Sequence, residues 1–357
     1  MDAEHPTATQ YGARGAALTL VAVAAVVAVA GVAFSLLPHA ATTAPIATIA
    51  PTLPPISPDP VVGLGFSVAA DPAANAVVLF GGLNSKARTW LLFDQHWVQA
   101  YPRTSPPDRS GAVAAYDPAT KVVMLFGGTL AAGSAVNDTW AWTGSNWRRL
   151  DSGTNGPPPG QGAQMAWDVA AGEMVLVTIG ETANSAETWV WTDRTSDSHW
   201  QREPLGNLAG SVFGDVMAYD PSTQAVLLVS PVTPDGGETL AMAWDGRSWQ
   251  ILTSHGPDIG AMAYYTPDRS LLACGLATYS ETAAVVSDCW EWTGSTWLQK
   301  VLAVPPPDSK QIIIETEVSD TNNSRLIMLG WLIHAIPGQP QPLGVWTWEG
   351  RQWLPLG

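Results

Sequence analysis

Charged side chains are scarce in this chain of 357 residues, since only 13% are Asp, Glu, Lys or Arg, and basic residues are the rarer kind. Lys and Arg number 16 against 31 Asp and Glu, which gives a formal net charge of −15. A protein with this balance repels phosphate backbones, so the composition argues against nucleic-acid binding. We interpret the acidic excess as an aid to solubility, with cations or basic partners as the alternative.

The short motifs of several enzyme classes are also missing. The chain contains no HExxH, no CxxC, no phosphate-binding loop and no Gly-x-Ser-x-Gly. We therefore expect no metal centre and no cofactor. One acidic run, formed by Glu315, Glu317 and Asp320, leaves a calcium site open, although a solvated strand edge is the simpler interpretation.

Tryptophan is abundant by contrast, and all 18 Trp residues follow residue 89 at regular intervals. Six times, a turn leads into a short apolar strand, a tryptophan-containing strand and one further Trp. The turns begin at Asp71, Asp117, Asp168, Asp220, Thr266 and Asp320, and the repeats close at Trp97, Trp147, Trp200, Trp249, Trp297 and Trp353. A period of about 50 residues is typical of solenoids, propellers and arrays.

The second repeat shows the plan most clearly. The turn that begins at Asp117 has Pro at its second position, which suits a type I turn. The run Val122–Phe126 predicts a buried strand. After Asp138–Trp142 a short Gly-containing turn leads to Trp147, so Trp142 and Trp147 should be cross-strand neighbours. Four strands per repeat and six repeats predict an all-β, six-bladed β-propeller over residues 62–357. We interpret most of the tryptophans as packing residues.

Several of these pieces resemble the kelch-repeat family, which includes propellers related to galactose oxidase. They are LFGG at Leu79–Gly82 and Leu125–Gly128, the Tyr-Asp-Pro turns, PPDRSG at Pro106–Gly111 and the Trp near each repeat's end. The resemblance covers about residues 62–357 and implies the fold far better than a function. Galactose oxidase itself is a copper enzyme, but no motif here matches its ligands, and we assign none.

The first 61 residues predict a membrane anchor and a linker. Residues 16–37 carry no charge and are long enough to span a bilayer, and Arg14 precedes them. We expect residues 1–15 to form a short cytoplasmic tail and residues 16–37 a single-pass helix, which places the propeller outside the cytoplasm. A cleaved signal peptide is the alternative. Residues 38–61 contain seven prolines and should form an extended linker.

The chain has only two cysteines, Cys274 and Cys289. Alignment of the repeats places them on the second and third strands of the fifth repeat, which are antiparallel neighbours. A disulfide across this hairpin is sterically possible, and an extracytoplasmic location would permit it. Two unpaired buried thiols are the alternative.

Strand topology sorts the loops of a propeller onto two faces. The Asp-Pro and Gly turns share one face, while the loops after the second strands and the connections between blades share the other. The second set is longer and more varied, and loops on a rigid scaffold often carry function. Our candidate ligand-binding residues on that face are Arg88, Arg109, Asn137, Glu181, Asp235, Glu281 and His334.

The sequence favours a non-catalytic, membrane-tethered module that binds a protein or an envelope polysaccharide through this face. The alternative is an extracytoplasmic propeller enzyme that acts on glycans or serves as an oxidase.

Overall fold

The structure is a computed structural model, and its described residues belong to a compact unit that spans Leu53–Gly357. The described residues are 59–154, 156–180, 185–192, 199–209, 215–230, 239–257, 259–275, 289–301, 312–332 and 341–356. The predicted anchor at 16–37 and most of the predicted linker lie outside them. Within the described ranges, no helix has the length and apolar character needed to cross a membrane.

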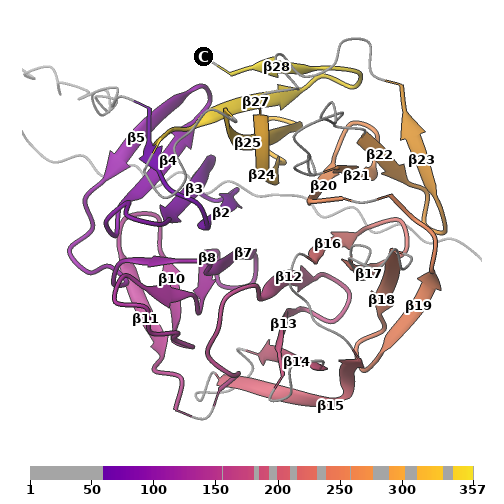
Figure 1. The fold of residues 1–357 in the computed structure, drawn as a ribbon, viewed down its shortest axis with the longest axis horizontal. Coiled ribbons are helices and arrows are strands. Elements are labelled where there is room, and N and C mark those ends of the chain that lie inside the picture. The colour runs from indigo at the N-terminus through magenta and orange to yellow at the C-terminus, as the bar shows by residue number, and fades with distance from the viewer. Residues whose placement is uncertain are drawn as a thin grey trace, which may run out of the picture. The chain divides into compact units, whose positions relative to one another are not determined.

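Six antiparallel sheets of four strands each follow one another around a ring in this unit (Figure 1). Each sheet, or blade, takes its strands from one repeat. The first three blades are β2 (Phe66–Asp71), β3 (Ala76–Gly81), β4 (Thr89–Phe93) and β5 (His96–Ala100); β7 (Val113–Asp117), β8 (Val122–Phe126), β10 (Thr139–Trp142) and β11 (Trp147–Asp151); and β12 (Gln164–Asp168), β13 (Glu173–Ile179), β14 (Ser185–Thr192) and β15 (His199–Ala209). The last three are β16 (Val216–Asp220), β17 (Ala225–Ser230), β18 (Leu240–Trp244) and β19 (Trp249–Thr253); β20 (Ala261–Tyr265), β21 (Ser270–Cys274), β22 (Cys289–Trp292) and β23 (Trp297–Lys300); and β24 (Ile312–Asp320), β25 (Arg325–Leu332), β27 (Gly344–Trp348) and β28 (Trp353–Pro355).

The ring closes through its inner strands, which are the first strand of each blade. Contacts run from β2 to β7, β12, β16, β20 and β24, and β24 returns to β2. A short strand, β1 (Val61–Val62), pairs with β26 (Gln341–Pro342) and so ties the start of the propeller to its last blade. A second short pair joins β6 (Arg109–Ser110) to β9 (Thr129–Leu130). The predicted six-bladed propeller is confirmed.

The turn between the first and second strands of each blade is built around a buried side chain. In the second blade, Asp117 Oδ1 accepts hydrogen bonds from the backbone N–H groups of Ala119, at 2.8 Å, and Thr120, at 3.3 Å. The last turn residue takes the left-handed conformation in all six blades, at Asn75, Lys121, Gly172, Gln224, Arg269 and Ser324. The fifth turn corrects our alignment, because the pairing of Tyr265 with Ser270 puts Tyr265, and not Thr266, at the Asp position.

The tryptophans fill the seams between blades. Trp142 and Trp147 are cross-strand partners with ring centroids 5.5 Å apart, which confirms that prediction. The indole N–H of Trp147 also donates to Thr89 Oγ1 of the preceding blade at 2.9 Å. The same bond recurs from Trp200 to Thr139 and from Trp249 to Thr188. These indoles therefore hold neighbouring blades together, in addition to the apolar area that they bury.

Cys274 and Cys289 form a disulfide between β21 and β22. Both residues are fully buried, and they pack with Leu326 and Met328 of β25 in the seam between the fifth and sixth blades. The bond thus joins two strands of one blade at a point where that blade meets the next.

Candidate functional site

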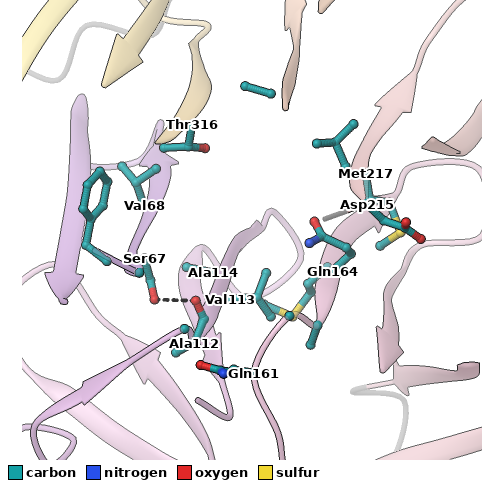
Figure 2. A pocket seen from close by; sticks show the side chains of 18 of the residues that line it. Ser67, Val68, Ala112, Val113, Ala114, Gln161, Gln164, Asp215, Met217 and Thr316 are labelled. Atoms are coloured by element: carbon teal, nitrogen blue, oxygen red, sulfur yellow. Dashed lines mark hydrogen bonds between the residues drawn. The ribbon is translucent and has the colours of Figure 1, made fainter. Parts of the chain in front are cut away.

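The inner strands surround a cavity of about 580 Å³ at the centre of the ring, which we call the central cavity (Figure 2). It is lined by residues 65–68, 111–114, 161–165, 215–217, 260–262 and 316–317, so all six blades contribute. In the first five blades these are the opening residues of each inner strand and those just before it. The cavity therefore lies toward the face that carries the connections between blades, which we call the connection face.

Glycines allow the connections to approach one another closely at the cavity. Gly65 and Gly111 have φ values of 71° and 67°, and the N–H of Gly111 donates to the carbonyl of Gly65 at 2.7 Å. A Cβ on Gly111 would lie 2.8 Å from the Cβ of Gln161 in the next blade. Side chains at these positions would be strained and would push adjacent blades apart.

Polar groups from different blades surround the open centre. Figure 2 shows Ser67, Gln164 and Thr316 around it, with Gln164 extending inward. The hydroxyl of Ser67 donates to the carbonyl of Ala112 at 2.8 Å, which joins the first two blades. Apolar side chains such as Val68 and Met217 complete the wall. Sites for small ligands usually combine apolar walls with a few convergent polar groups, and this cavity has both.

Two residues that line this cavity carry buried carboxyl groups; our sequence analysis considered Glu317 only as part of an acidic run and did not consider Asp215. Glu317 is 6% exposed, and burial raises its pKa to about 8. Asp215 is 4% exposed; burial raises its pKa to about 7, although a hydrogen bond with Ser230 acts in the opposite direction. Both Glu317 oxygens and Asp215 Oδ2 are without a hydrogen-bond partner in the described part of the chain. In Figure 2 the Asp215 carboxyl turns away from the open centre.

The interpretation of the acidic run as a solvated strand edge is wrong for Glu317 and Asp320, which are buried, and the side chain of Glu315 lies outside the described residues. β24 is an inner strand, so Glu317 is enclosed by the neighbouring blade. Asp320 lies at the far end of β24, where its Oδ2 accepts from Arg325 at 2.7 Å. Glu315 falls at an irregularity in the register of β24 with β25. Among the described residues, no three His, Cys, Asp or Glu side chains are placed to hold a metal ion.

Aligned repeats contain a signal that points to Glu317. It stands three residues before the turn position Asp320, and the pairing registers place apolar residues there in all five other blades. They are Val68, Ala114, Met165, Met217 and Met262. An acid at one of six otherwise apolar inner positions marks the sixth blade as different.

Arg109, one of the candidate ligand-binding residues, is buried in the structure and does not present its side chain to solvent on the connection face. Arg109 is 3% exposed, and its guanidinium binds the carboxylate of Asp138 through two bonds of 2.6 and 3.1 Å. It also donates to the carbonyl of Gly127 at 2.9 Å. Burial alone would raise the pKa of Asp138, but hydrogen bonds from Arg109 and Trp140 outweigh it and lower that pKa. Arg109 is thus part of the packing between loops.

The other candidate residues do not form one described cluster. The side-chain amide of Asn137 donates to the carbonyls of Gly153 and Pro157, at 2.9 and 2.7 Å, and so fastens the connection that follows the second blade. Arg88 is half-buried in the loop between β3 and β4. Glu181, Asp235, Glu281 and His334 lie outside the described residues.

Comparison with known proteins identifies the fold. No protein-family model and no curated protein matches the sequence. Among solved structures, YjhT is 13% identical and superposes with a TM-score of 0.52 over 85% of this chain and 99% of its own. A variant of the lectin of Aleuria aurantia in complex with alpha-methyl-L-fucoside is 13% identical, with a TM-score of 0.56 over 84% and 96% of the two chains. A variant of AofleA from Arthrobotrys oligospora is 11% identical, with a TM-score of 0.54 over 84% and 87%.

At these identities the likeness establishes the propeller fold alone. The resemblance to the kelch and galactose-oxidase propellers stays a prediction, because the matches do not assign the chain to that family.

Proposed function

We propose that this protein is a non-catalytic binding module that holds an envelope polysaccharide or a protein on its connection face. The observation that carries this proposal is the central cavity of about 580 Å³, to which all six blades contribute. The fold likeness to a lectin whose structure contains a fucoside favours the polysaccharide. Because that likeness is one of fold, the ligand has to be found from the chemistry of this chain's own cavity.

The proposal includes a membrane location. Residues 16–37 form a single-pass anchor, and residues 38–61 form an extended linker that keeps the propeller away from the bilayer. The propeller then lies outside the cytoplasm, where envelope polysaccharides are accessible to it.

One observation favours the alternative of a glycan-active enzyme. Asp215 and Glu317 are carboxyl groups with raised pKa values beside a cavity, and groups of this kind are often acids or bases in catalysis. Glycoside hydrolysis commonly uses two carboxyl groups on either side of the scissile bond. Release of reducing ends from an envelope polysaccharide, abolished by Glu317→Gln, would identify such an enzyme.

Capture of envelope components tests the binding proposal. Full-length protein, purified in a mild detergent and immobilised, is exposed to solubilised envelope, and retained sugars and proteins are identified. Gln164→Trp places a bulky ring in the central cavity, and we expect it to abolish retention of the polysaccharide. The control Gln250→Trp adds the same ring to exposed β19 and should retain it. Equal retention by both variants would show that the ligand does not use the cavity.

A further inference from the structure

Glu317 is a buried acid that the fold itself does not require. Glu317 is one of the residues that line the central cavity, and its two carboxyl oxygens are buried without a hydrogen-bond partner among the described residues. Burying such a group without a partner destabilises a protein. The five apolar residues at the matching positions show that a blade of this propeller forms without an acid there. A group that is unfavourable for folding and lies beside a cavity is a candidate for ligand binding.

The described surroundings of Glu317 supply no positive charge. Glu317 is opposite Met328 in the sheet, and Met328 packs with Ala261 and Trp346 in the seam between the fifth and sixth blades. The titratable residue of β20 in that seam is Tyr265, at the far end of the strand. Among the described residues that line the cavity, Asp215 is the one other group that ionises, and none is Lys, Arg or His.

We propose that the central cavity binds the primary ammonium group of an amino sugar, with Glu317 as its counter-ion. This inference rests on the proposed function, because it names the ligand class that the same cavity takes. An ammonium ion brings the positive charge that the described lining of the cavity lacks, and its attraction to a carboxylate is strong in low-dielectric surroundings. The hydroxyls of the sugar would meet Ser67, Gln164 and Thr316, which come from three blades around the open centre (Figure 2).

Binding is coupled to the loss of one proton. Burial raises the pKa of Glu317 to about 8, so the carboxyl is mostly protonated at neutral pH before the ligand arrives. When the ammonium group binds, the Glu317 O–H bond breaks, the proton goes to solvent, and the carboxylate pairs with the ammonium. The rotatable bonds of the Glu317 side chain let the carboxyl turn from the seam toward the open centre, which its neighbour Thr316 lines. A neutral sugar would leave the carboxyl protonated.

Calorimetry with a matched pair of sugars tests the proposal. Full-length protein in non-ionic detergent is titrated with D-glucosamine or D-glucose at about pH 6, where amines are protonated. Two buffers with different heats of ionisation count the protons released. We expect glucosamine to bind with release of about one proton per site and glucose not to bind. Glu317→Gln should weaken glucosamine binding about 30-fold or more, the usual effect of removing one partner of a buried charge pair, and should abolish the proton release.

Two further variants separate the role of Glu317 from general effects. Glu317→Met installs the residue found at this position in three other blades and should behave as Glu317→Gln does. Glu349→Gln makes the same chemical change at an exposed turn of the sixth blade and should bind glucosamine normally. Thermal melting of each variant verifies that it is folded.

Several outcomes would overturn the proposal. They are equal binding of glucose and glucosamine, unchanged proton release in Glu317→Gln, and binding of Nα-acetyl-lysine methylamide in place of glucosamine. If wild-type protein retains an envelope polysaccharide but does not bind glucosamine, this inference fails while the proposed function stands. If it retains no envelope component and does not bind glucosamine, both fail.

Discussion

Replacing Glu317 by Gln should change how the stability of the propeller depends on pH. Glu317 is buried without a partner, and burial raises its pKa from 4.5 to about 8. The folded protein therefore holds this proton over a pH range in which the unfolded chain has lost it. Because the folded state binds more protons, the free energy of unfolding must fall as the pH rises through that range. Gln has nearly the same shape and does not titrate.

The size of the effect follows from the width of the range. Each pH unit between the two pKa values removes about 1.4 kcal/mol. At neutral pH the loss due to Glu317 amounts to about 3 kcal/mol, and above pH 8 it reaches at most about 5 kcal/mol. Asp215 also makes the free energy of unfolding fall as the pH rises, because burial raises its pKa from 3.8 to about 7. This contribution is the same in wild type and in Glu317→Gln. The difference between wild type and Glu317→Gln therefore isolates Glu317, and it grows from near zero at acidic pH to its full value above pH 8.

Urea unfolding between about pH 4 and 9 measures this difference, with the many tryptophans as fluorescent reporters. Glu349→Gln, at an exposed turn of the same blade, is the control and should follow the wild-type curve at every pH. If the curves of wild type and Glu317→Gln stay parallel across the range, Glu317 is ionised in the folded protein, and the burial argument fails.

Two contacts between distant parts of the chain give further predictions, both measured by urea unfolding. Trp147→Phe removes the hydrogen bond to Thr89 of the neighbouring blade and should lower the free energy of unfolding by about 1–2 kcal/mol more than Trp353→Phe, because Trp353 Nε1 has no partner among the described residues. Equal losses would show that the bond adds nothing to packing. Arg109→Met leaves the carboxylate of Asp138 buried without its counter-ion, so the free energy of unfolding should fall by about 3–5 kcal/mol. A loss below about 1 kcal/mol would mean that the pair of Arg109 and Asp138 behaves as a solvent-exposed ion pair does, and the burial argument would fail.

The propeller fold can be predicted from the sequence because each pattern that indicates it lies within a single repeat. Asp117 at the start of a turn, the apolar run Val122–Phe126 and the pair Trp142 and Trp147 lie within 31 residues of one another. Turn chemistry, strand propensity and cross-strand pairing act over such distances. Six copies of the same local plan then predict six blades, and the strand alignment also places Cys274 beside Cys289, as the structure does.

Solvent exposure was decided by tertiary contacts that the repeat pattern does not contain. Arg109 belongs to a loop in sequence, yet its partner Asp138 is 29 residues away and lies beside it only in the folded second blade. Glu317 belongs to an acidic strand with the appearance of a solvated edge, yet closing the ring makes that strand the inner one of its blade. The sequence by itself thus determined the six blades, because they depend on neighbouring residues. Only the tertiary structure decided which polar side chains are buried and which line the cavity, because the packing of one blade on the next encloses them.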